Sequence, residues 1–295
     1  MKKSTYILIG LLVVLAGAAY LVTMKPGERS ISAEEGASFV QIDSLAVDKI
    51  EITTPTSSVT LEKKGVEWFV QSPIVYRADQ TDVANTIQQI KAMQVKNIVS
   101  SNPQKHNLFQ VDSTGTHVVV YEKGTQKASF IFGKIGPTFS DSYARLTGSN
   151  DVALVTGAYA YTFNRPVKEW RDRTIFSTPR ENINQVEFQF GDTTFTLVFQ
   201  DSTWKIGKDT VNVSTVESFL SSLSKFECDE FVDSLPSPLP KLTAQIRVAG
   251  TQIRFHHVKD GAKYFVQTSA SPQWFEVQPW RAEQILKRKK DLVKK

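Results

Sequence analysis

An internal repeat constrains the fold of this chain more than any other feature of its sequence. When the sequence is shifted so that Ile50 falls on Val186, Trp68 falls on Trp204 and the apolar residues around them also match. Tryptophan occurs only five times in the 295 residues, so two aligned tryptophans within a matched apolar pattern indicate a duplicated unit. We therefore predict two tandem copies of one domain, each of roughly 100 residues.

Within each copy, the apolar pattern predicts three strands, one helix and four more strands. Apolar and polar residues alternate at 50–52 and 59–61, which is typical of half-buried strands. A cap-like residue then begins the helix, Asp79 or Thr81 in the first copy and Ser214 in the second. The apolar stripe of this helix comprises Val83, Ile87, Ile90 and Val95 in the first copy and Val216, Leu220, Leu223 and Phe226 in the second.

The remaining strands follow the helix and are joined by hairpin-length links. They are predicted at 117–121, 127–132, 142–146 and 152–155 in the first copy, and at 244–248, 252–255, 264–267 and 274–277 in the second. The predicted fold class is α+β: an N-terminal transmembrane helix, then two tandem βββαββββ copies in which one helix covers an antiparallel sheet. The predicted organisation is a transmembrane signal anchor at 1–25, a tether at 26–44, the first copy at 45–158, a packed link at 159–180, the second copy at 181–280 and a basic tail at 281–295.

The N-terminal segment predicts a membrane anchor. The run Tyr6–Met24 carries no charge and as a helix is long enough to cross the ~30 Å hydrocarbon layer. Lys2 and Lys3 precede it, so the positive-inside rule places the N-terminus in the cytoplasm and the body outside the cytoplasmic membrane. The alternative is a signal peptide cleaved at Ala16–Ala18. We favour the uncleaved anchor because the apolar run continues past that site.

The net charge of +5 resides at the two ends of the chain. Residues 1–25 carry three lysines and no acidic residue, and residues 281–295 carry seven basic residues against two acidic ones. The body between them is therefore slightly acidic. A nucleic-acid-binding domain concentrates its basic residues on the folded body, so we predict that no nucleic acid is bound.

The sequence contains no motif for catalysis, a metal or a cofactor. The patterns G-x-S-x-G, H-E-x-x-H and G-x-G-x-x-G do not occur, and the single cysteine, Cys228, rules out a zinc site of several thiolates. His256 and His257 are adjacent in a predicted strand, so their side chains point to opposite faces. His106 and His117 have no nucleophile motif nearby. We predict a non-enzymatic protein with no catalytic, metal or cofactor site.

The densest charged cluster of the body is a candidate interaction site. It comprises Arg165, Trp170, Arg171, Asp172 and Arg173. Guanidinium groups suit bidentate contacts and tryptophan can anchor a partner. The alternative, which we favour, is an internal salt-bridge network that holds the two copies together.

The basic tail is a candidate membrane-surface site. Its apolar residues Ile285, Leu286, Leu292 and Val293 are spaced for one narrow helical face, and basic side chains surround them: Lys287, Arg288, Lys289 and Lys290. A short basic amphipathic helix can lie on anionic lipid. A solvated tail is an equal alternative.

Several short motifs resemble an uncharacterised bacterial family, the domain of unknown function 4340. The resemblance covers residues ~45–280 and consists of I-x-I at 50–52, V-x-L at 59–61, W-x-V at 68–70, V-D…G at 111–115, Gly133-Lys134, Y-x-R at 143–145 and W-R-D-R-x-I at 170–175. It implies no catalytic residues. Because members of the family often accompany gliding-type ABC transporters, the resemblance implies an accessory role at the cell envelope.

These observations together predict a single-pass, membrane-anchored, non-enzymatic protein that acts by protein–protein contact in a bacterial envelope assembly. Its expected partners are the bilayer, through Tyr6–Met24, and proteins of the cytoplasmic membrane; ABC-transporter subunits are implied by the resemblance alone. The first alternative is an extracytoplasmic module that binds a sugar or peptidoglycan fragment in a cleft between the copies, lined by Trp170, Trp274 and Trp280. The second is a hydrolase in which a carboxylate–histidine pair converges in a pocket.

Overall fold

The computed structural model describes residues 34–158, 160–258 and 263–294. The chain divides into two compact units, Met1–Asp172 and Arg173–Lys295, called unit one and unit two below. The boundary falls inside the segment 159–180 that the sequence indicates as a link. Each unit has its own apolar core, since the buried residues of the two core clusters run from Phe39 to Trp170 and from Ile175 to Leu292.

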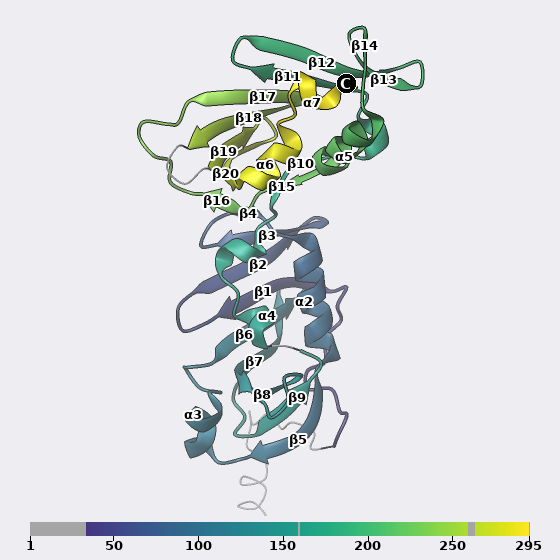
Figure 1. The fold of residues 1–295 in the computed structure, drawn as a ribbon. Coiled ribbons are helices and arrows are strands. Elements are labelled where there is room, and N and C mark those ends of the chain that lie inside the picture. The colour runs from purple at the N-terminus through teal and green to yellow at the C-terminus, as the bar shows by residue number, and fades with distance from the viewer. Residues whose placement is uncertain (1–33, 159, 259–262, 295) are drawn as a thin grey trace, which may run out of the picture. The chain divides into compact units, whose positions relative to one another are not determined.

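Unit one is a nine-stranded antiparallel sheet in the order β4-β3-β2-β1-β6-β7-β8-β9-β5 (Figure 1). Its strands are β1 (Val47–Thr53), β2 (Ser58–Lys64), β3 (Glu67–Ser72), β4 (Tyr76–Arg77), β5 (Gln94–Ser100), β6 (Thr116–Glu122), β7 (Thr125–Ile135), β8 (Asp141–Leu146) and β9 (Val152–Thr156). Its helices are α2 (Gln80–Ala92), α3 (His106–Phe109) and α4 (Ala160–Phe163), with 3₁₀ turns at Pro103–Lys105 and Val167–Trp170.

Unit two contains a second nine-stranded sheet, in the order β14-β13-β12-β11-β17-β18-β19-β20-β16. Its strands are β11 (Gln185–Phe190), β12 (Thr193–Gln200), β13 (Thr203–Ile206), β14 (Asp209–Thr210), β16 (Glu230–Val232), β17 (Leu242–Val248), β18 (Thr251–Val258), β19 (Lys263–Thr268) and β20 (Ser271–Val277). The other elements are the paired strands β10 (Thr174–Ser177) and β15 (Lys225–Glu227), a 3₁₀ turn at Arg180–Asn182, and the helices α5 (Val213–Ser224), α6 (Pro279–Ile285) and α7 (Lys289–Leu292).

The two sheets have the same strand order and the same register. Ile50 of β1 pairs with Leu61 and Val120, and Val186 of β11 pairs with Leu197 and Val248 in the same way. Positions in the regular part of these pairings therefore have defined counterparts in unit two, whereas the pairing of β7 with β8 is irregular between Phe132 and Ile135 and that of β18 with β19 is not.

One long helix lies on the apolar face of each sheet. Asp79 caps α2 by accepting a hydrogen bond from the backbone N–H of Asp82 at 2.9 Å, and Asn212 caps α5 by accepting one from Thr215 at 3.2 Å. Each cap satisfies one of the backbone donors that a helix leaves unpaired at its first turn. The apolar stripes then pack into the cores, with Val83 and Ile90 buried in unit one and Val216 and Leu220 buried in unit two.

The predicted α+β class of two βββαββββ copies is wrong. The described residues form twenty strands, and antiparallel sheet predominates over helix. Strands β4 and β14 have only two residues each, too few to show an alternating pattern. Val95 and Phe226 extend the helical stripes but lie in strands β5 and β15, because α2 stops where Met93 takes an extended backbone and α5 stops at Ser224.

The transmembrane part of the predicted fold class is also unsupported. No helix of the described residues is both long and apolar enough to span a bilayer. The segment Tyr6–Met24, from which the anchor was inferred, lies outside the described residues.

Candidate functional site

Four side chains of unit one form a row across neighbouring strands, on the face of the sheet that points away from the core. Thr53 pairs with His117, His117 with Ile131, and Ile131 with Arg145. Successive residues of a strand point to opposite faces; because their neighbours such as Ile52, Val118, Phe130 and Ala144 are buried in the core, these four, called the outer row, point outward.

Residues 103–115, called the wall segment, border a pocket above the outer row. The pocket has a volume of about 380 Å³ and is lined by Thr53, Thr54, Asp112, Ser113, Gly115, His117, Ile131 and Arg145. Arg145 binds the wall segment directly, since its Nε donates to the carbonyl of Val111 at 2.8 Å, while its Nη1 donates to the carbonyl of Ser149 at 2.9 Å. Val111 itself is fully buried.

Two glycines allow the wall segment to approach the sheet closely. A Cβ atom at Gly133 would overlap the carbonyl oxygen of Phe109 and lie 2.8 Å from Cγ1 of Val111. A Cβ atom at Gly115 would lie 2.6 Å from the carbonyl oxygen of Phe132. Both distances are too short for real carbon contacts, so any larger residue must displace the backbone.

Replacing Gly133 with alanine is expected to detach the wall segment from β7. Overpacking of this kind costs ~1–3 kcal/mol, and the loss should be local. We expect faster amide hydrogen exchange at residues 106–111. Gly65→Ala is the matched control: it introduces strain at a positive φ of 65° but has no neighbour within 4 Å. Equal exchange at 106–111 in both variants would contradict the close packing.

Burial and charge perturb the titratable groups around the outer row. Burial lowers the pKa of His117, and the Arg145 charge lowers it further, against an opposing effect of Glu51. Burial also lowers the pKa of Arg145, partly offset by Asp112. Hydrogen bonds from the Thr114 hydroxyl and backbone N–H hold the pKa of Asp112 below its usual value. The pocket thus contains an ionised carboxylate and a guanidinium next to a histidine that resists protonation.

A separate ionic cluster lies beside this pocket. Glu51 accepts hydrogen bonds from Lys49 Nζ and from the Tyr121 hydroxyl, both at 2.9 Å, and Lys49 also lies 3.7 Å from the centre of the Tyr121 ring. Burial raises the pKa of Glu51, but the hydrogen bonds from Lys49 and Tyr121 outweigh it, so the net shift is downward. These three groups satisfy one another.

His117 also contacts a serine, which bears on the hydrolase alternative. Its Nε2 lies 3.0 Å from the hydroxyl of Ser129 and 3.2 Å from that of Thr147. The Ser129 side chain, however, donates to Thr147 at 2.8 Å, and the residue is only 3% exposed. Among the described residues no carboxylate hydrogen-bonds to His117. The arrangement therefore lacks both an accessible nucleophile and the group that orients the base in a triad.

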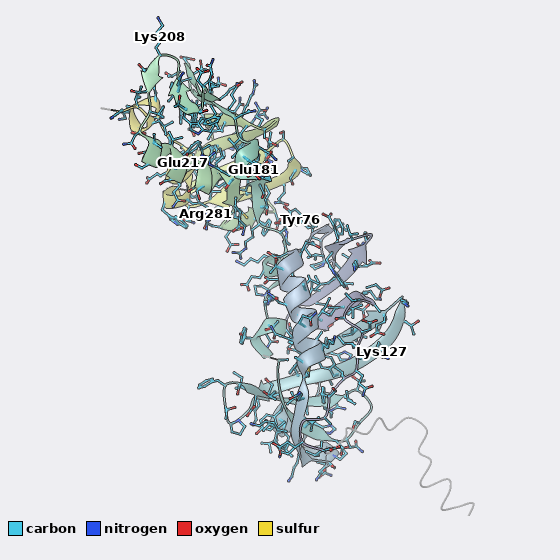
Figure 2. The ribbon with its side chains drawn as sticks, turned by 90° about the vertical axis from the view of Figure 1, so that its right-hand side faces the viewer. Tyr76, Lys127, Glu181, Lys208, Glu217 and Arg281 are labelled. Atoms are coloured by element: carbon cyan, nitrogen blue, oxygen red, sulfur yellow. The ribbon has the colours of Figure 1, made fainter. Side chains whose placement is uncertain are left out.

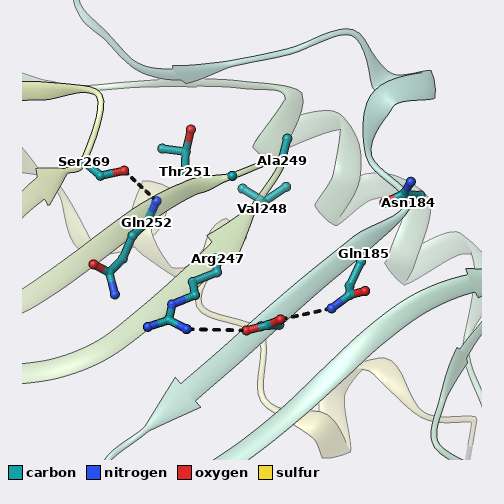
Figure 3. Close-up of a pocket in the computed structure, with 10 residues that line it drawn as sticks. Asn184, Gln185, Arg247, Val248, Ala249, Thr251, Gln252 and Ser269 are labelled. Carbon is teal, nitrogen blue, oxygen red and sulfur yellow. Dashed lines mark hydrogen bonds and ion pairs between the residues drawn. The ribbon is translucent and has the colours of Figure 1, made fainter.

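Unit two has a pocket of about 530 Å³ with different chemistry, shown in Figure 3. Arg247 and Gln185 both point toward the carboxylate of Glu187, at 4.0 Å and 3.0 Å respectively, and Gln252 donates its backbone N–H to the Ser269 hydroxyl at 2.9 Å. The charges of this pocket are paired with each other, and the exposed pair contributes little to stability.

Residues 165–172 of the charged cluster belong to the interior and rim of unit one. Trp170 is 0% exposed and Arg171 is 2% exposed. Arg165 lies 4.4 Å from the Trp170 ring and forms an ion pair with Asp82 at 2.7 Å. The described contacts of Trp170 and Arg171 make them structural parts of this unit rather than an accessible docking site.

The end of the cluster lies at the boundary between the units. Asp172 binds Arg77 of unit one through its side chain and donates its backbone N–H to the Arg77 carbonyl at 2.9 Å. Arg173 is partly exposed, and its carbonyl accepts a hydrogen bond from Cys228 of unit two at 2.9 Å.

The apolar residues of the basic tail are part of the core of unit two. Ile285 and Leu292 are buried there, and Leu286 packs against the same core, so they do not form the exposed face that the lipid-binding hypothesis requires. The four basic residues lie on its surface: Lys287, Arg288, Lys289 and Lys290. Arg288 lies 3.9 Å from the Phe190 ring, and Lys289 pairs with Asp209 at 2.8 Å.

The three tryptophans of the ligand-binding alternative have different surroundings. Trp170 is in the core of unit one. In unit two, Trp274 contacts His256 with ring centres 5.0 Å apart and ring planes tilted by 60°, whereas Trp280 is 55% exposed with Arg281 4.5 Å from its ring. None of the three lines either of the two larger pockets described above.

Comparison with known families identifies the chain. The model of a family described as "Domain of unknown function (DUF4340)" matches residues 68–245, which is more than half of the chain. The chain belongs to the DUF4340 family. This confirms the resemblance carried by the sequence motifs, and the matched region of this DUF4340 chain includes Asp112, His117 and Arg145 of the pocket. No curated protein and no solved structure matches the chain.

Proposed function

We propose that this DUF4340 protein is a non-enzymatic binding protein of the bacterial cell envelope that acts by protein–protein contact through the pocket of unit one. The observation that supports this proposal is the convergence of the outer row and the wall segment on one pocket. Its lining combines arginine, histidine, hydroxyl groups and a carboxylate around the apolar Ile131. Such a mixture is typical of protein interfaces, which are polar and contain arginine among their principal contacts.

The rigidity of the pocket also supports a binding role. Arg145 is fixed by two backbone carbonyls, and Asp112 is fixed by Thr114. A pocket whose side chains are already ordered loses less conformational entropy when a partner binds. We further propose that the body works on the outer side of the cytoplasmic membrane, as both interpretations of residues 1–25 require, and that the partner is an ABC-transporter subunit; the latter rests on the family resemblance alone.

Site-specific photocrosslinking in cells tests this proposal. A photoreactive phenylalanine analogue at Ser113, which is exposed and lines the pocket, is expected to give a discrete protein adduct. The matched control positions are Lys127 in unit one and Lys208 in unit two, both exposed (Figure 2). We expect no comparable adduct from either of them.

The identity of the adduct, established by mass spectrometry, separates the parts of the proposal. A transporter subunit supports the whole of it. Another protein exposed on the outer side of the membrane supports the contact function and ends the transporter part. An adduct with a cytoplasmic protein contradicts the location, and no adduct above the Lys127 control contradicts the contact function.

A further inference from the structure

We propose that the pocket of unit one binds a carboxylate that carries a neighbouring N–H group, as the C-terminal residue of a peptide does, with Arg145 as its anchor. This inference rests on the proposed function, in which a protein partner supplies the carboxylate. The groups that recognise the carboxylate all belong to residues that line the pocket.

Arg145 is a partly buried cation that no carboxylate of the described residues contacts directly; Asp112 acts on it only as a nearby charge. Nε and Nη1 donate to backbone carbonyls, whereas Nη2 donates to no atom of the described residues, and Arg145 forms no ion pair with any of them. A partly buried charge gains most from an opposite charge that reaches it, and a guanidinium forms strong charge-assisted hydrogen bonds with a carboxylate. The free Nη2 is therefore the anchor of the site.

Asp112 supplies the second point of recognition. It accepts hydrogen bonds from Thr114 through Oδ1, and within the described residues Oδ2 has no hydrogen-bond donor. Its negative charge disfavours a ligand that is only an anion. A ligand with an N–H group next to its carboxylate satisfies Arg145 and Asp112 together, and Ser113 adds a hydroxyl at the same rim.

The pKa of His117 should change when a ligand binds in the pocket. Arg145 lies on the same face of the sheet, two strands away across Ile131. Glu51 lies on the neighbouring strand β1, and Asp112 lies in the wall segment. A bound carboxylate partly cancels the Arg145 charge that opposes protonation of His117. Occupancy should therefore raise the pKa of His117, and by linkage the ligand should bind more tightly as the pH falls through that pKa.

Unit two provides a natural comparison because its register is the same. At the positions equivalent to Thr53, His117, Ile131 and Arg145 it has Gln189, Gln245, Arg254 and Gln267. The anchor position thus carries a neutral amide in unit two. The substitution Arg145→Gln gives unit one the residue that the same sheet already accommodates at that position in unit two.

Ligand-observed NMR on the full chain tests the inference with three small probes: N-acetylglycine, N-acetylglycinamide and acetate. We expect saturation transfer to N-acetylglycine, weaker transfer to acetate, and none to N-acetylglycinamide, which lacks the carboxylate. Arg145→Gln should weaken N-acetylglycine binding about tenfold or more, as loss of a charged hydrogen bond implies. The control Arg254→Gln in unit two should leave it unchanged. Equal transfer to N-acetylglycine and its amide overturns the inference.

A measurement on the unsubstituted chain covers the case in which the Arg145 variant fails to fold. The chain has four histidines, so labelled imidazole signals can be followed individually. N-acetylglycine should raise the pKa of His117, whereas the imidazole signals of His257 in unit two should not change when the probe is added. A pKa of His117 that does not move at saturating probe overturns the inference.

The outcomes also separate this inference from the proposed function. If Arg145→Gln abolishes N-acetylglycine binding but Ser113 gives no protein adduct, the pocket binds a small free carboxylate and the contact function fails. If Ser113 crosslinks a partner and Arg145→Gln leaves the adduct unchanged, the contact function stands and the carboxylate anchor fails.

Discussion

Replacing Trp68 or Trp204 with alanine is expected to lower the free energy of unfolding of its own unit by ~3–5 kcal/mol. The two side chains are 7% and 9% exposed and belong to separate core clusters. Truncating a large buried aromatic ring removes its apolar contacts and leaves a cavity that the surroundings fill only in part. Because the cores contain no common residue, each substitution should shift one unfolding transition and leave the other in place.

Chemical denaturation followed by circular dichroism measures both transitions. Trp280→Ala is the matched control, since this side chain is 55% exposed and exposed substitutions usually change stability by less than ~0.5 kcal/mol. If Trp68→Ala and Trp204→Ala unfold like the control, the two rings do not belong to the cores.

Replacing Trp170 with alanine is expected to destabilise unit one by a similar ~3–5 kcal/mol. The ring is fully buried, and Arg165 covers it at 4.4 Å while pairing with Asp82 of α2. The truncation therefore removes core packing and the surface against which Arg165 is held. Denaturant unfolding of unit one measures the loss.

A second substitution at the same position separates packing from hydrogen bonding. The indole Nε1 of Trp170 is buried and has no hydrogen-bond partner in the described structure, and such an orphan donor costs ~1–3 kcal/mol. Trp170→Phe keeps most of the ring and removes that donor, so it should be much milder than Trp170→Ala. A partner-anchoring tryptophan would behave differently: both variants would leave unfolding unchanged and abolish the Ser113 adduct.

The duplicated pattern of the central strands was readable from the sequence because each strand is half-buried. The pattern of apolar and polar residues predicted the ends of β6 and β17 to within two residues. The aligned tryptophans gave the number of residues that separates the two copies. The sequence did not determine which residue caps each helix, because several residues that can act as N-caps lie close together before each helix begins. Asp79 is the cap of α2, but Asn212 caps α5 instead of Ser214, whose hydroxyl donates to the Asn212 side chain at 2.8 Å.

The edges of the sheets could not be predicted from local patterns. Strand β5 starts two residues after α2 ends, so Val95 continued the helical spacing. Its strand conformation depends on pairing with β9, which lies more than fifty residues further along the chain. Strand β16 depends in the same way on β20. Such long-range pairings leave no periodic signal in a three-residue strand.

The pocket was missed because it depends on register between strands. His117 and Arg145 were both visible in the sequence, but neither has a motif of its own. The outward direction of His117 follows from the inward Val118 and Val120, yet its place in one row with Arg145 requires the pairing of β6 with β7 and of β7 with β8. The charged cluster at 165–173 left two interpretations open, a partner site and the favoured internal network, because charge density alone does not show which side chains are buried; Trp170 and Arg171 are.

The shared register of the two sheets gives the chain an internal reference for engineering. Where the pairing is regular, a residue on β1, β6, β7 or β8 can be exchanged for the residue that occupies the same register position on β11, β17, β18 or β19. Transferring the outer row and the wall segment to unit two would test whether its sheet can support the same binding pocket. The sequence of either unit can thus guide the choice of substitutions in the other.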